Sequence, residues 1–122
     1  MTERDLHMND KYARHLSGMV RFPTVSSPDT SLTDYSVFDK FREYLEDAYP
    51  LVHKTLERTK IARASLLYRW KSEAPKKKPI LLMTHQDAVP AGDPGNWKYL
   101  LFPERSLKAS YGDVVRLTAR AS

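Results

Sequence analysis

The sequence contains no cysteine, which excludes both a disulfide framework and a metal site built from thiolates. It also lacks any apolar run of membrane-spanning length, and the polar residues 1–10 contain no signal-peptide core. We therefore expect a cytoplasmic protein without a membrane partner. The length of 122 residues allows one small domain at most, and a hydrophobic content of 41% is enough to form its core.

The net charge is +5, and Lys76, Lys77 and Lys78 form a dense basic cluster. Such a cluster can bind the phosphates of a nucleic acid, or it can be a solvated turn between two strands. No aromatic residues are interleaved with the lysines, which favours the turn and predicts no nucleic-acid partner. The alternative is a small basic module that binds nucleic acid or protein through these lysines, Arg63 and Arg69. A steep salt dependence of binding would identify it.

Two amphipathic helices are predicted in the first half of the chain. The first runs from about residue 3 to residue 21 and ends at a Phe-Pro pair, because a residue before proline disfavours the α conformation. The second begins with Thr33 or Asp34 as its cap, and Pro50 ends it. One apolar stripe follows helical spacing along this second helix, made by Val37, Phe38, Phe41, Leu45, Ala48 and Tyr49.

Three stretches of strand character follow the helices. Residues 52–57 alternate weakly, and residues 64–71 place Leu66, Tyr68 and Trp70 on one face. After a turn over residues 72–78, residues 80–83 read Ile-Leu-Leu-Met. A run that is apolar on both faces predicts a strand buried between two layers of a parallel sheet. The order of helices before strands predicts an α/β fold with helices packed on a sheet.

His85 and Asp87 directly follow the apolar run, so they are expected at the carboxyl end of a strand, where open α/β sheets place ligand sites. A neutral imidazole is a good zinc ligand, and a nearby carboxylate can fix its tautomer and orientation. The pattern also fits a structural histidine, with Asp87 capping a turn of the following loop. That loop is rich in turn residues, namely Pro90, Gly92, Pro94 and Gly95.

A third possibility is a small hydrolase with a complete site of its own. Its candidate groups are His7, His15 and His53, none of which has ligand spacing toward His85. We expect His15 and His53 at surface positions, the first on a helix and the second on a strand.

Residues 81–90, Leu-Leu-Met-Thr-His-Gln-Asp-Ala-Val-Pro, and the later Asn-Trp-Lys-Tyr at 96–99 resemble the first metal motif of a family of two-zinc hydrolases. This family contains the aminoacylases, carboxypeptidase S and the succinyl-diaminopimelate desuccinylases. Residues 22–26, Phe-Pro-Thr-Val-Ser, are similar to the segment that follows the family's first helix. Residues 38–41 and 66–70 resemble its second helix and second strand. The resemblance covers about residues 10–99 and is strongest from residue 80.

The resemblance implies an α/β fold, the amino-terminal part of a three-layer zinc-exopeptidase-like domain with helices packed on a mixed sheet. It implies that His85 binds one of two zinc ions and that Asp87 is the catalytic-site aspartate that steadies this histidine. The implied reaction is hydrolysis of an amide next to a free carboxylate, with a peptide or an N-acyl amino acid as substrate. The bridging aspartate, the base and the remaining ligands match no residue here, so we expect an inactive amino-terminal fragment that does not retain zinc.

After Tyr99 the resemblance stops, which divides the chain into residues 1–99, the amino-terminal part of a catalytic domain, and residues 100–122. The family would continue with Pro-Pro-Phe-Ser-Gly, whereas residues 100–104 read Leu-Leu-Phe-Pro-Glu. Loss of one C from a Tyr-Pro-Pro-Phe-Ser-Gly coding run produces the observed residues, and the same shift permits a Gly-Arg-Gly-Ala-x-Asp stretch further on. We therefore expect an out-of-frame segment in which Asp113 is accidental. The alternative is a genuine short family member with a divergent tail.

Overall fold

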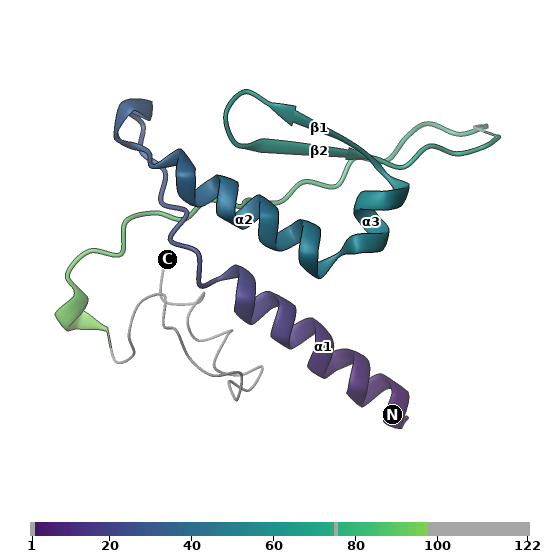
Figure 1. Cartoon of the computed structure of the whole chain (residues 1–122), viewed down its shortest axis with the longest axis horizontal. Coiled ribbons are helices and arrows are strands. Elements are labelled where there is room, and N and C mark those ends of the chain that lie inside the picture. The colour runs from purple at the N-terminus through teal and green to yellow at the C-terminus, as the bar shows by residue number, and fades with distance from the viewer. Residues whose placement is uncertain (1, 75, 98–122) are drawn as a thin grey trace.

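The structure is a computed structural model that describes residues 2–74 and 76–97 of the chain (Figure 1). The tail predicted over residues 100–122, with Asp113, lies outside the described residues. The described part consists of three helices, two 3-10 turns (Thr30–Leu32 and Pro94–Asn96) and two strands, which is an α/β arrangement as expected. None of its helices has the length and apolar character that a bilayer crossing requires.

Both predicted amphipathic helices are present, as α1 (Glu3–Met19) and α2 (Tyr35–Ala48). At the start of α1, the Thr2 hydroxyl accepts a hydrogen bond from the Asp5 N–H at 3.2 Å, and the Asp5 carboxylate accepts one from the Thr2 N–H at 2.9 Å. Of the two cap candidates for α2, Asp34 is the N-cap, because its carboxylate accepts a backbone N–H two residues on at 3.0 Å. Local capping therefore fixes where each helix begins.

Residues 52–57 do not form the predicted strand, and that prediction was wrong. Pro50 ends α2 as expected, but it also begins a further helix, α3 (Pro50–Thr55). Proline is favoured at the first helical position because its missing N–H would have no intrahelical partner there. The same residue thus stops one helix and starts the next.

The sheet of the described residues is a two-stranded antiparallel hairpin of β1 (Glu57–Ile61) and β2 (Ser65–Arg69). Ala62 in the connection has a φ of 53°, the left-handed conformation that tight turns use. β2 lies within the predicted residues 64–71, and its Leu66 and Tyr68 are half-buried on one face, as expected. Trp70 was predicted on that face but is 81% exposed, because it lies beyond the end of β2.

The core is centred on α2. Phe38 and Phe41, both from the predicted apolar stripe, are the buried hydrophobic residues of the described part of the chain. The ring of Phe22, which follows α1, meets the ring of Phe41 edge to face at a centroid distance of 5.6 Å. A Cβ at Gly18 would collide with the ring of Tyr44, so glycine at this position lets α1 pack closely against α2.

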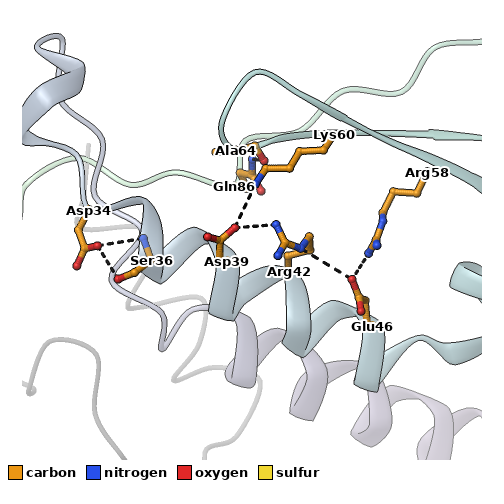
Figure 2. A network of polar contacts seen from close by, with 9 residues as sticks. All are labelled: Asp34, Ser36, Asp39, Arg42, Glu46, Arg58, Lys60, Ala64 and Gln86. Atoms are coloured by element: carbon orange, nitrogen blue, oxygen red, sulfur yellow. Dashed lines mark hydrogen bonds and ion pairs between the residues drawn. The ribbon is translucent and has the colours of Figure 1, made fainter.

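Ion pairs orient the hairpin over α2 (Figure 2). Asp39 accepts a hydrogen bond from Lys60 Nζ at 3.2 Å, and Glu46 pairs with Arg58. These cationic partners hold the pKa of both carboxyl groups below the usual range, because they stabilise the ionised form. Since the pairs are exposed to solvent, they set the orientation of β1 more than they stabilise the fold.

Residues 80–83 do not form the predicted buried strand, and this prediction was also wrong. The four side chains are 70% to 90% exposed, and the segment is extended without strand pairing (Figure 1). A strand that is buried on both faces needs hydrogen-bonded neighbours and covering layers. The sheet of the described residues contains only β1 and β2, neither of which pairs with this run.

We expect the double variant Ile80→Lys/Leu82→Lys to remain monomeric up to a severalfold higher protein concentration than the parent chain. Contiguous apolar side chains on extended, unpaired backbone promote association between molecules, and added charge opposes it. Sedimentation velocity at increasing concentration measures the change. Leu51→Lys is the matched control, because Leu51 is 75% exposed but lies on α3. An equal gain from the control would contradict this explanation.

Candidate functional site

The segment that follows residues 80–83 is held by residues 24–26, more than sixty positions away in sequence. Val25 and Ala88 form an isolated parallel bridge, in which the Ser26 N–H donates to the Ala88 carbonyl at 3.1 Å and the Ala88 N–H donates to the Thr24 carbonyl at 2.9 Å. The hydroxyl of Thr24, a buried residue, donates to the Gln86 carbonyl at 2.7 Å. The chain after α1 therefore fixes the backbone on which His85 and Asp87 lie.

Gln86 attaches the same segment to the hairpin. Its side-chain amide donates to the Ala64 carbonyl, in the connection between β1 and β2, at 2.7 Å (Figure 2). Alternate side chains of an extended chain face opposite sides. Gln86 is thus directed to the hairpin, while His85 and Asp87 share the other side.

The structure brings the two predicted site residues together. The His85 Nδ1 lies 2.9 Å from one carboxylate oxygen of Asp87, and the other oxygen accepts a hydrogen bond from the Ser26 hydroxyl at 2.6 Å. The hydrogen bonds from Ser26 and then His85 hold the pKa of Asp87 below its usual range. Asp87 is consequently ionised at neutral pH and can only accept hydrogen bonds.

This geometry determines which ring nitrogen of His85 carries the proton. Because the Asp87 carboxylate can only accept, a neutral His85 must donate from Nδ1, and its Nε2 then holds the free lone pair. The His85 side chain is 93% exposed. Metal-binding histidines commonly have this arrangement, in which one ring nitrogen donates its proton to a carboxylate and the other presents a free lone pair.

The arrangement does not activate a serine nucleophile. Ser26 donates to the carboxylate, whereas a nucleophilic serine has to donate to a base such as an imidazole. The residues fit one ligand of a metal site, because His85 offers a free ring nitrogen. Within residues 2–74 and 76–97, however, no group of three or more side chains of the metal-binding kinds is gathered.

The other three histidines lie elsewhere. His53 was expected on a strand but belongs to α3, where Nδ1 is 2.8 Å from the Tyr49 carbonyl and Nε2 is 2.8 Å from the Tyr68 hydroxyl. His15, expected at the surface, is half-buried with its ring edge to face against Tyr49. His7 is exposed on α1. The structure does not bring them together with His85.

Arg63 and Arg69, two of the basic residues considered for a binding module, lie next to other residues of the fold. The guanidinium of Arg63 lies over the Tyr35 ring, 4.3 Å from its centroid, which occupies one face of this cation within the fold. Arg69 is the last residue of β2 and faces Glu57 across the hairpin. Lys76, Lys77 and Lys78 are exposed, as a solvated connection predicts.

The roles of Ser26, Thr24 and Gln86 could not be predicted from the sequence. Residues 22–26 were recognised by their resemblance to a family segment, but no spacing rule relates them to a residue sixty positions later. Gln86 lies between the two predicted site residues, and its direction becomes apparent once the hairpin is in place.

Comparison with known proteins gives a consistent set of relatives. Carboxypeptidase S of Saccharomyces cerevisiae is 37% identical over 91 residues, which cover 69% of this chain and 16% of the relative. A second protein of that yeast, provisionally named a carboxypeptidase, is 38% identical and covers 78% of this chain and 18% of its own length. The N-fatty-acyl-amino acid synthase/hydrolase PM20D1 of Mus musculus is 36% identical, over 66% of this chain and 16% of the relative.

The chain therefore spans less than a fifth of the length of these relatives. No protein-family model matches the chain, and no solved structure matches it significantly. The relatives carry the names of carboxypeptidases and of an N-fatty-acyl-amino acid synthase/hydrolase, and carboxypeptidase S is among the groups of the family that residues 81–90 resemble.

Proposed function

Because this chain belongs to the carboxypeptidase S and aminoacylase-like family of hydrolases, we propose that it is part of a zinc-dependent hydrolase that cleaves an amide next to a free carboxylate. The observation that supports the proposal most is the His85–Asp87 pair, with Nδ1 and the carboxylate 2.9 Å apart and the imidazole exposed. We propose peptides or N-acyl amino acids as substrates, since the relatives named above are called carboxypeptidases and an N-fatty-acyl-amino acid hydrolase.

In this proposal His85 would bind zinc through Nε2. A bound metal pair supplies polarisation of the amide carbonyl and activation of the attacking water. The contribution of Asp87 is to accept the Nδ1–H, which keeps the Nε2 lone pair free and fixes the orientation of the ring. The finer fold, a three-layer domain on a mixed sheet, is part of the same proposal, because such a sheet would cover the exposed residues 80–83.

We also propose that residues 100–122 are out of frame. Residues 100–104 are Leu-Leu-Phe-Pro-Glu. A DNA segment that encodes Pro-Pro-Phe-Ser-Gly gives these residues when it loses one base. In the relatives described above the match covers at most 78% of this chain, which leaves room for an unrelated tail. The bridging carboxylate and the remaining ligands would then be absent, and this chain would be inactive. Genomic sequence past codon 99, read in all frames, decides between a frameshift and a divergent tail.

A zinc titration of the chain as it exists tests the role of His85. We expect zinc to move the imidazole NMR signals of His85 at several-fold lower concentration than those of His7, an exposed histidine on α1 that serves as the control. The reason is that the carboxylate beside Nδ1 prepares His85 for coordination. Equal responses of the two histidines would contradict the proposal.

The same preparation is expected to release no amino acid from N-acyl or dipeptide substrates at any zinc concentration. The described residues gather one histidine with one supporting carboxylate, which provides too few ligands for a catalytic zinc site. Zinc-dependent hydrolysis that His85→Ala abolishes would contradict the expected inactivity and the frameshift together.

A further inference from the structure

We propose that Ser26 is a positioning residue for the candidate metal ligand His85, acting through Asp87, and this inference rests on the proposed function of the site. The Ser26 hydroxyl donates to one oxygen of the Asp87 carboxylate at 2.6 Å, and His85 occupies the other oxygen at 2.9 Å. Two donors on opposite oxygens fix the rotation of the carboxylate plane. Without Ser26 the carboxylate can turn, and the oxygen that faces His85 is no longer defined.

The position of the Ser26 hydroxyl is determined by the fold. The Ser26 N–H donates to the Ala88 carbonyl at 3.1 Å, and the Ala88 N–H donates to the Thr24 carbonyl at 2.9 Å. Asp87 therefore lies between Ala88, which pairs with this segment on one side, and Gln86, whose carbonyl accepts the Thr24 hydroxyl at 2.7 Å. Backbone pairing at Ala88 and the Thr24 hydroxyl at Gln86 hold the chain on both sides of Asp87, which aligns its carboxylate with Ser26 before any ligand binds.

The consequence concerns the tautomer of His85. A neutral imidazole in water carries its proton mostly on Nε2, which would block that nitrogen as a metal ligand. Acceptance of the Nδ1–H by a fixed Asp87 oxygen reverses this preference and leaves the Nε2 lone pair exposed. Ser26 thus acts on the nitrogen that would bind metal without contacting the imidazole or a substrate.

The test measures the tautomer of His85 in the full chain, by long-range proton–nitrogen NMR at roughly pH 8, above the ordinary pKa of imidazole. We expect Ser26→Ala to lower the ratio of Nδ1–H to Nε2–H by about 2- to 5-fold, the effect of one lost hydrogen bond at a partly exposed site. The neighbouring change Ser27→Ala is the control and is expected to leave the ratio unchanged.

Ser26→Thr and Ser26→Val form a matched pair of the same shape that differs by the hydroxyl group. We expect the threonine variant to keep the ratio of the parent chain and the valine variant to lose it, even if the alanine variant disturbs the pairing of residues 24–26 with Ala88. The amide signals of Thr24 and Ala88 report that pairing independently. Equal ratios in the threonine and valine variants would overturn the inference.

The outcome is separable from that of the zinc titration. If zinc fails to move the His85 signals while the tautomer ratio depends on the Ser26 hydroxyl, then the proposed function fails and the positioning contact stands. If zinc binds His85 and the tautomer ratio does not change when the Ser26 hydroxyl is removed, then the metal role stands and Ser26 has no positioning role. Where both hold, Ser26→Val is expected to weaken zinc binding at His85 and Ser26→Thr is not.

Discussion

Restoring one C within the codons for Leu100 and Leu101 is expected to turn this chain into a zinc-binding amide hydrolase. The repaired frame would read Tyr-Pro-Pro-Phe-Ser-Gly from Tyr99 and continue into the Gly-Arg-Gly-Ala-x-Asp stretch that the family resemblance implies. The physical reason is ligand number. The described residues supply His85 and its supporting Asp87, and a catalytic site needs further carboxylate and histidine ligands.

Two measurements check the repair. Metal analysis of the purified repaired protein should find two zinc ions per chain, and release of the amino acid from an N-acyl amino acid should become zinc-dependent. The unrepaired chain, expressed in the same way, is the control and should show neither property. A stop codon soon after the repaired position, or a frame without acidic and histidine residues, would leave His85 a structural residue of a short protein.

In the repaired protein, His85→Ala is expected to abolish zinc binding at one position and with it the activity, because it removes a direct ligand. Asp87→Ala is expected to lower zinc affinity or the rate by roughly 10–100-fold, the usual effect of losing a carboxylate that supports a metal-bound histidine. Asp87 is 2.9 Å from the Nδ1 of His85, so it acts through the ring rather than on the metal in this proposal.

His7→Ala is the matched control, since His7 is exposed on α1 and lacks a place in the proposed site. Metal content by mass spectrometry and the rate at saturating zinc separate the two effects. The His85 variant should lack one of the two zinc ions at every zinc concentration, whereas the Asp87 variant should bind both at higher zinc. Full zinc content in the His85 variant, or identical losses in both variants, would contradict the assigned roles.

Several features followed from the sequence because they depend on neighbours in the chain. The apolar stripe of α2 repeats at helical spacing, Asp34 caps the helix two residues away, and the interiors of both long helices matched prediction. The pairing of His85 with Asp87 is equally local, since side chains two residues apart in extended backbone lie on the same side. Family membership followed from the residues around this pair. The cytoplasmic location stays a prediction.

The errors lie where local pattern does not determine the outcome. Residues 52–57 alternate too weakly to decide between strand and helix, and Pro50 at a first helical position favoured the helix. Residues 80–83 have the composition of a buried strand but are exposed, because their burial requires neighbouring strands and layers that the described residues do not supply.

The sequence by itself therefore determined the two long helices, the His85–Asp87 pair and the family to which the chain belongs. Only the tertiary structure showed that Ser26 binds the second oxygen of Asp87 and that Gln86 attaches the segment to the hairpin at Ala64. The physical reason is the range of the interactions. Caps and helical stripes join residues within one or two turns, whereas these hydrogen bonds join segments 22 and 61 positions apart, and no periodicity in the sequence specifies such contacts.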